Sequence, residues 1–190
     1  MPANISLYTV NSIIFLDNDG KRLLAKYYKP PHGEADPDSL AGQDKKQATF
    51  EANLFQKTQK VNGDIILFEN QIVVYKEYSD VIIYLTGGLN ENEALLYTTL
   101  QGLIGALDIV LKSSIDKKSI QENYDMVSLA VDETADDGII LETDPAVIAS
   151  RVTKAPTDDV NIKIDLSEKG LFNAFQFAKS KVSERLQQGF

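Results

Sequence analysis

The feature that most constrains the fold of this chain is a set of three extended apolar runs separated by gaps of only two residues. The runs are Ile65 to Glu69, Ile72 to Tyr78 and Val81 to Thr86, and the gaps are Asn70-Gln71 and Ser79-Asp80. A parallel connection needs a crossover of about a dozen or more residues, so gaps this short allow only antiparallel pairing. The three runs therefore predict an antiparallel meander.

A second pair of strands is predicted near the N-terminus. The segments Leu7 to Leu16 and Arg22 to Tyr28 flank the turn sequence Asp17-Asn18-Asp19-Gly20, which favours a β-hairpin. Within the first segment, Ile13-Ile14-Phe15-Leu16 runs without polar alternation. Such a run is typical of a strand buried on both faces. We therefore expect helices on both sides of this sheet.

Several segments have the periodicity of amphipathic helices, and three of them begin with the spacing of a capping box. The predicted helices run from Asp44 to Thr58, from Asn90 to Leu111, from Ser119 to Glu133 and from Asp144 to Val152, with capping pairs Asp44 and Gln47, Asn90 and Glu93, and Ser119 and Glu122. A further extended stretch, Ile139-Ile140-Leu141, follows Asp136-Asp137-Gly138. The element order ββαβββ followed by helices predicts an α+β fold. We expect one five-stranded antiparallel sheet, with the 44–58 helix on one face and the 90–111 and 119–133 helices on the other.

The C-terminal part of the chain has a different composition. We predict one domain over residues 1–153, a linker over 154–165 and a helical extension over 166–190. In the extension, apolar residues recur at helical spacing, namely Leu171, Phe175, Ala178, Val182 and Leu186. The helix could dock on protein or lie on a membrane surface, and the acidic character of the chain favours protein. The polar stretch 33–43 is expected to be a loop.

Charge and cysteine content limit the classes of partner. The formal net charge is −9, from 28 acidic and 19 basic side chains, so nucleic acid or an anionic membrane would be repelled. The pairs Lys45-Lys46 and Lys117-Lys118 are interpreted as solvated helix starts. The chain has no cysteine, which excludes disulfides and thiolate metal sites. Without a signal sequence at its start or an apolar run approaching roughly 20 residues, we expect a cytoplasmic protein.

Residues that could support catalysis are sparse. The single histidine, His32, cannot supply a Ser-His-Asp triad or a histidine metal cluster. The turn 17–20 resembles the start of a calcium loop, but Lys21 breaks the ligand pattern. The pairs Asp132-Glu133 and Asp136-Asp137 could act as catalytic carboxylates, although solvated acids are the favoured interpretation. No glycine motif for phosphate is present. We predict no enzymatic activity, no metal and no cofactor.

Tyrosines on the predicted strands are the candidate partner anchors. Tyr27, Tyr28, Tyr75 and Tyr78 lie on these strands, where tyrosine serves both in sheet packing and in protein interfaces.

Several longer segments resemble one known family. They include Lys26-Tyr27-Tyr28-Lys29-Pro30-Pro31-His32, Tyr75-Lys76-Glu77-Tyr78, Asp116-Lys117-Lys118-Ser119-Ile120-Gln121-Glu122-Asn123-Tyr124-Asp125-Met126-Val127, Ala130-Val131-Asp132-Glu133-Thr134 and Ile148-Ala149-Ser150-Arg151-Val152. These segments closely resemble the zeta subunits of coatomer, the COPI vesicle coat. Zeta subunits are longin-type (SNARE-like) small chains related to the sigma subunits of clathrin adaptors. The resemblance runs from Leu7 nearly to Phe190, but the 33–43 loop has no match.

The resemblance implies a structural coat subunit rather than an enzyme. It implies pairing with the helical trunk of gamma-coatomer, in a subcomplex that also holds beta- and delta-coatomer. An Arf-family GTPase would recruit this complex, and with it the chain, to Golgi membranes for retrograde transport to the endoplasmic reticulum. The expected locations are the cytoplasm, the peripheral Golgi membrane and COPI-coated vesicles.

The alternative is a sigma-type clathrin-adaptor chain that recognises dileucine sorting signals. By the resemblance, the sigma pocket falls on Ser79, Val81, Ile104, Ser113, Ser114 and Ser119, with Leu23 where a sigma chain can have a basic residue. Serine hydroxyls are poor partners for leucine side chains, since burying a polar group without a hydrogen bond costs free energy. The pocket is therefore predicted to be degenerate. The tail beyond Pro156 has no counterpart in a typical sigma chain, which also favours zeta.

Overall fold

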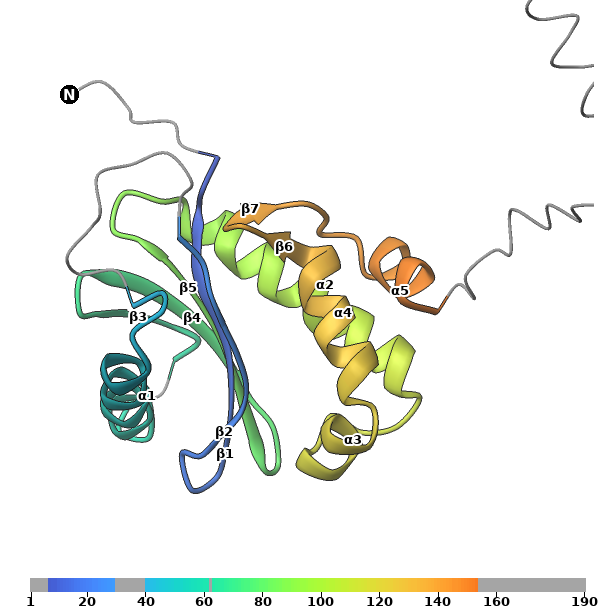
Figure 1. Ribbon diagram of the computed structural model, residues 1–190, viewed down its shortest axis with the longest axis horizontal. Helices are drawn as coiled ribbons and strands as arrows, with labels where there is room; N and C mark the ends of the chain where they lie inside the picture. The colour runs from blue at the N-terminus through green and yellow to red at the C-terminus, as the bar shows by residue number, and fades with distance from the viewer. Residues whose placement is uncertain (1–6, 30–39, 62, 154–190) are drawn as a thin grey trace, which may run out of the picture. The chain divides into compact units, whose positions relative to one another are not determined.

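The computed structural model describes residues 7–29, 40–61 and 63–153, and this part of the chain contains the predicted five-stranded antiparallel sheet (Figure 1). The strands are β1 (Val10–Asp17), β2 (Arg22–Tyr27), β3 (Ile65–Phe68), β4 (Gln71–Glu77) and β5 (Val81–Gly88). Their order across the sheet is β2-β1-β5-β4-β3. The N-terminal hairpin and the meander are thereby confirmed, and β2 and β3 form the two edges.

Helices cover both faces of the sheet, as predicted. The helices are α1 (Asp44–Thr58), α2 (Glu93–Leu111), α3 (Lys117–Glu122), α4 (Tyr124–Thr134) and α5 (Pro145–Thr153). Figure 1 shows α1 on one side of the sheet and the other helices on the opposite side. Two short strands, β6 (Ala135–Asp136) and β7 (Ile139–Ile140), connect α4 to α5.

The position of β1 inside the sheet explains why its sequence does not alternate. Ile13 and Phe15 belong to the core cluster beneath α2, α4 and α5, whereas Ile14 and Leu16 belong to the cluster beneath α1. All four side chains are fully buried. Burying an aliphatic or aromatic side chain of this size stabilises a fold by about 1.5–3 kcal/mol. Both faces of β1 therefore contribute to the core.

Two glycines of α2 allow another segment to approach closely. A Cβ atom at Gly102 would lie 2.3 Å from the Thr143 carbonyl oxygen, and one at Gly105 would lie 2.9 Å from Cγ of Pro145. Neither distance is sterically possible without movement of the neighbour. These glycines therefore serve the packing of α5 on α2.

Two predicted capping boxes are wrong. Helix α1 does span residues 44–58, but Asp44 is its first helical residue, and the residue at the N-cap makes no side-chain capping bond. Helix α2 begins at Glu93, and its cap is Asn92, whose Oδ1 accepts from the backbone N–H groups of Ala94 and Leu95. The segment before α2 contains asparagines at two positions, so sequence spacing alone selected the wrong one.

The predicted helix over 119–133 is two helices. Its start is also misplaced, because α3 begins at Lys117 and Asp116 caps it by accepting from the Ser119 backbone N–H. The chain leaves α-helical geometry at Asn123 before α4 begins. The apolar period continues through this break because Ile120 and Val127 are both buried in the same cluster. Because the apolar periodicity is continuous, the sequence did not reveal that the chain changes direction between α3 and α4.

The sequence did not predict the hairpin of β6 and β7. Asp137 and Gly138 between the two strands have φ values of 47° and 82°, as a tight hairpin of this kind requires. The predicted extended stretch 139–141 therefore contains the short strand β7, which pairs with β6 directly after α4. The first strand also begins later than predicted, at Val10, whose N–H donates to the Gly138 carbonyl at 3.0 Å.

The length and apolar character of α2 were underestimated from the sequence. An 18-residue window of this 19-residue helix has a mean hydropathy of 1.6, so by length and composition the helix could cross a membrane. More than half of the same stretch is buried against the rest of the chain. The burial identifies α2 as the core helix of the domain.

Several predictions fall on residues outside the described part of the chain. These are the 154–165 linker, the 166–190 helix, most of the 33–43 loop and the surroundings of His32.

Candidate partner interface

Strand β2 is tied to α1 by a buried carboxylate. The Glu51 side chain is 6% exposed and accepts from Arg22, with 2.7 Å between Oε1 and Nη2. The Tyr27 hydroxyl donates to the same carboxylate at 2.7 Å. Burial, and then the hydrogen bond to Glu51, raises the pKa of the Tyr27 phenol well above its ordinary value. Tyr27 is therefore part of an internal network.

The other face of β2 is tied to α4 and β6. The Tyr28 hydroxyl donates to the Ala135 carbonyl at 3.0 Å, and the Lys26 ammonium pairs with Asp132. Burial raises the pKa of Tyr28, with smaller contributions from Asp132 and the acids of the β6–β7 turn. Tyr28 is therefore also held by its own chain.

The two tyrosines of the meander lie on opposite faces of the sheet. Tyr75 is 4% exposed, and its hydroxyl donates to the Val61 carbonyl at 3.2 Å on the α1 side. Tyr78 is half-buried against the α2-side cluster, and burial, followed by the charge of Asp108, raises its pKa to about 12. Tyr27 and Tyr75 face α1, whereas Tyr28 and Tyr78 face the other layer. The four side chains do not form one patch, and their role as anchors stays a prediction.

The positions that match the sigma pocket do gather, around the β4–β5 turn and the start of α3. The Lys117 backbone N–H donates to the Asp80 carboxylate at 3.0 Å, which joins the two segments. Among the six positions, Val81 and Ile104 are buried in the chain's own core. Ser79, Ser113 and Ser114 are exposed, and Ser119 is partly exposed.

Three of the four serine hydroxyls bond to neighbours at the junction of α2 and α3. The Ser113 and Ser119 hydroxyls are 3.1 Å apart, and Ser114 donates to Asp116 at 2.6 Å. Since the two apolar positions point into the core and these three hydroxyls are paired, they are poorly suited to hold leucine side chains. The degenerate pocket stays a prediction. Leu23, at the remaining position, packs against the α2-side core.

A buried aspartate organises the same end of the molecule. The Asp17 side chain is 4% exposed and accepts from the Lys117 ammonium at 2.8 Å. It also accepts from the backbone N–H groups of Asp19 and Lys21. Burial acts to raise the pKa of Asp17, but the hydrogen bonds from Lys117 and the backbone outweigh it and lower the pKa. The 17–20 sequence is therefore a turn, as interpreted, with its carboxylate already occupied.

Lys117 differs from its predicted role and Lys118 does not. Lys118 is highly exposed and lies 3.8 Å from Glu122 one helical turn away, as in a solvated helix start. Lys117 instead joins α3 to the β1–β2 turn. The sequence carries no local signal for this bond, because its partner lies 100 positions away.

The candidate catalytic carboxylates have structural partners. Asp132 pairs with Lys26, and Glu133 lies 3.3 Å from Nη1 of Arg151 on α5. Asp136 and Asp137 are exposed in the β6–β7 turn. Within residues 7–29, 40–61 and 63–153, no group of three or more His, Cys, Asp or Glu side chains could hold a metal ion.

Comparison with known proteins gives consistent relatives. The family model for the clathrin adaptor complex small chain matches residues 9–159. The coatomer subunit zeta of Saccharomyces cerevisiae is 51% identical over 188 residues, which cover 98% of this chain and 99% of the relative. The coatomer subunit zeta-1 of Bos taurus is 38% identical over 177 residues, which cover 93% of this chain and 92% of the relative.

Structural comparison finds the same fold in an adaptor complex. A chain from a homology model of the full-length AP-3 complex in a stretched open conformation superposes with a TM-score of 0.55 at 14% identity. The match covers 90% of this chain and 98% of that chain, and it supports the fold alone. The sequence relatives are close enough and long enough to decide the family. This chain belongs to the clathrin adaptor small-chain family, and within it to the coatomer zeta subunits.

Proposed function

We propose that this chain is the small structural subunit of a COPI coat and that its biochemical work is to pair with the gamma-coatomer trunk. The observation that carries the proposal is the 51% identity to a coatomer zeta subunit across 98% of the chain. Pairing with gamma would place the chain beside beta- and delta-coatomer in the coat. Its recruitment by an Arf-family GTPase to Golgi membranes, for retrograde transport to the endoplasmic reticulum, follows from that complex.

The internal bonds support scaffolding over cargo recognition. At the positions of a sigma-type dileucine pocket, Val81 and Ile104 are core residues and the Ser113, Ser114 and Ser119 hydroxyls are paired, which disfavours binding of leucine side chains there. Two of the acids considered for catalysis form ion pairs instead: Asp132 with Lys26 of β2, and Glu133 with Arg151 of α5. The function therefore rests on surfaces that a protein partner can cover.

A replacement experiment tests this function. The chain is expressed in Saccharomyces cerevisiae depleted of its own coatomer zeta, and growth and retrieval of endoplasmic-reticulum proteins are measured. We expect growth and retrieval to be restored, and affinity purification of the chain to recover gamma-, beta- and delta-coatomer. Failure to recover any large coat subunit, with the chain folded and expressed, would reject the proposal.

A further inference from the structure

Strand β3 forms an open edge of the sheet. The Tyr75 N–H donates to the Asp64 carbonyl at 2.9 Å, and the register continues as Ile65 opposite Val74 and Ile66 opposite Val73. In an antiparallel pair, successive residues alternate between bonding their partner strand and pointing away from it. Ile66 and Phe68 therefore bond β4. The N–H and C=O groups of Ile65 and Leu67 point out of the sheet edge.

The same two residues expose apolar side chains. Ile65 is 46% exposed and Leu67 is 68% exposed, whereas Ile66 between them is buried on the α1 side. Since side chains alternate along a strand, Ile65 and Leu67 stand on the opposite face, beside Ile72 and Val74. Helix α2 packs over β4 and β5 on this face. Natural sheets usually shield such an edge with charge, proline or a covering element.

We call Ile65 and Leu67, with their outward main-chain groups, the β3 strip. One charged side chain beside this strip lacks a partner. Lys76 lies on the same face of β4 as Ile72 and Val74, two positions beyond the last β4 residue that pairs with β3. Among the described residues no carboxylate pairs with Lys76, since Asp64 belongs to the α1-side face near Tyr75. The β3 strip, with its two apolar side chains and outward main-chain groups, therefore lies beside an unpaired cation.

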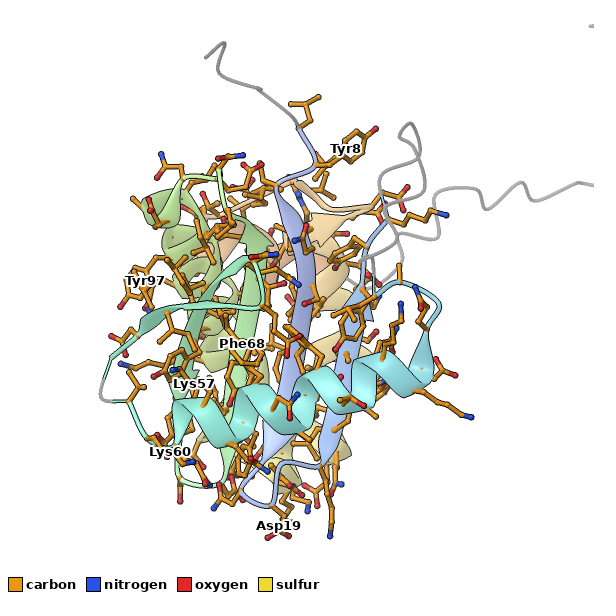
Figure 2. The ribbon with its side chains drawn as sticks, turned by 90° about the vertical axis from the view of Figure 1, so that its left-hand side faces the viewer. Tyr8, Asp19, Lys57, Lys60, Phe68 and Tyr97 are labelled. Atoms are coloured by element: carbon orange, nitrogen blue, oxygen red, sulfur yellow. The ribbon has the colours of Figure 1, made fainter. Side chains whose placement is uncertain are left out.

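Figure 2 views the molecule with α1 in front, that is, from the face of the sheet opposite Ile65 and Leu67. Phe68 of β3 and Tyr97 of α2 lie on the side where α1 ends, and Lys57 and Lys60 lie there too. Neither lysine forms an ion pair with a carboxylate in the described part of the chain. Both lysines lie on the α1 side, and the exposed Asp64 and Glu69 lie at the two ends of β3, so the cation that a partner's carboxylate would meet on the Ile65 and Leu67 face is Lys76.

From this geometry we propose that an extended, acid-containing segment of the large coat subunit adds to β3 as a sixth strand. Its main chain bonds Ile65 and Leu67, its apolar side chains cover theirs, and a carboxylate meets Lys76. Strand addition is a known mode of peptide recognition, in which main-chain bonds give affinity and alternate side chains give specificity. The inference rests on the proposed function, because that function supplies the partner.

The side-chain contribution is tested by binding of the purified gamma-coatomer trunk, measured by titration calorimetry. We expect Leu67→Asp to weaken binding at least tenfold and Lys76→Glu severalfold. The matched controls are Leu129→Asp on α4, which changes a 41% exposed leucine, and Lys45→Glu in the first turn of α1. Both controls should bind like wild type. Equal binding by Leu67→Asp and wild type would overturn the inference.

Strand addition is tested separately with proline. Leu67→Pro removes only an outward N–H, and proline is tolerated on edge strands. Leu67→Pro should therefore melt within a few degrees of Leu67→Ala, as followed by circular dichroism, yet bind the trunk at least tenfold more weakly. Equal binding by the two variants would overturn strand addition.

The outcomes separate this inference from the function on which it rests. If the wild-type chain fails to bind any large coat subunit, the proposed function fails. If the wild type binds and all β3 variants bind equally, only the edge assignment fails. A second copy of the chain is the competing occupant. A wild-type dimer in sedimentation equilibrium that Leu67→Asp converts to monomer would overturn the choice of partner.

Discussion

The two edges of the sheet differ in how their side chains contact the rest of the chain. Along β2, the polar side chains find partners within the domain: Arg22 and Tyr27 meet Glu51, Lys26 meets Asp132, and Tyr28 meets a β6 carbonyl. Along β3, two apolar side chains and their main-chain groups face outward. The polar side chains at one edge are held by intramolecular bonds, and we call that edge closed; the exposed side chains at the other edge are left available.

The difference teaches where stability and recognition reside. An edge whose bonds are internal contributes to the free energy of unfolding and has little left to offer a partner. An edge without such bonds contributes little to folding and retains its binding capacity. Substitutions at the bonded side chains of β2 should therefore act on stability, and those at the outward-facing Ile65 and Leu67 of β3 on association.

The largest expected effect comes from Glu51 at the closed edge. In Glu51→Ala, the Arg22 guanidinium and the Tyr27 hydroxyl lose their shared acceptor, and Arg22 is only about one-third exposed. Removing one partner of a largely buried charge pair costs more than the pair contributes. We expect a loss of about 2–4 kcal/mol in the free energy of unfolding, measured by urea denaturation.

Glu122→Ala is the matched control for this change. Its carboxylate is 63% exposed and lies 3.8 Å from Lys118, so its loss should cost about 0.5 kcal/mol or less. Similar destabilisation by both substitutions would contradict the view that β2 is closed by a buried network.

The sequence predicted the sheet more accurately than the contacts that close it. The short gaps around Asn70-Gln71 and Ser79-Asp80 left antiparallel pairing as the only option, and the sheet has that form. The 44–58 helix was also placed correctly, because its apolar stripe is local information. Helix starts were less accurate, since several polar residues near each start satisfy the same spacing rule.

Sequence patterns could not predict side-chain partners that lie far apart in the sequence. Glu51 accepts from residues 24 and 29 positions away, and Lys117 meets Asp17 across 100 positions. No periodicity links such pairs. The tyrosines illustrate the limit, because a strand position fixes the face of a side chain only after the register is known. The resemblance to a family, by contrast, was carried by continuous segments and is confirmed.

A second prediction concerns acid at the end of the closed hairpin. The pKa of Asp17 is lowered in the folded chain, so its contribution to stability is present above the unfolded value of 3.8 and is lost as the pH falls through the folded value. Asp17→Asn should cost about 1–3 kcal/mol at pH 7, because the turn and Lys117 lose a charged acceptor.

The pH profile distinguishes this charge effect from simple loss of packing. The stability difference between wild type and Asp17→Asn, from urea unfolding at several pH values, should stay constant near neutrality and shrink below pH 3.8. A difference that does not change with pH would contradict the assigned role of the carboxylate.

A smaller effect is expected at Tyr28. Tyr28→Phe removes only the hydroxyl that donates to the Ala135 carbonyl, so the free energy of unfolding should fall by about 0.5–1.5 kcal/mol. Tyr124→Phe alters a tyrosine that is 50% exposed and should leave stability unchanged. If Tyr28→Phe weakens binding of gamma-coatomer while thermal melting is unaltered, then Tyr28 is a partner contact and β2 is not closed.

The smallest effect on stability is expected at the open edge. Leu67 is 68% exposed, and its truncation to alanine removes few contacts within the chain, so the free energy of unfolding should change by about 0.5 kcal/mol or less. Its neighbour Ile66 has the same strand environment but is 9% exposed, and Ile66→Ala should cost about 2–4 kcal/mol by leaving a cavity under α1. Urea denaturation of the two variants compares the two faces of one short strand directly. A large loss for Leu67→Ala would mean that the exposed side chain already has a partner within the chain, and β3 would then be as closed as β2. A small loss would leave the exposed leucine without a role in folding, as a surface kept for another protein requires.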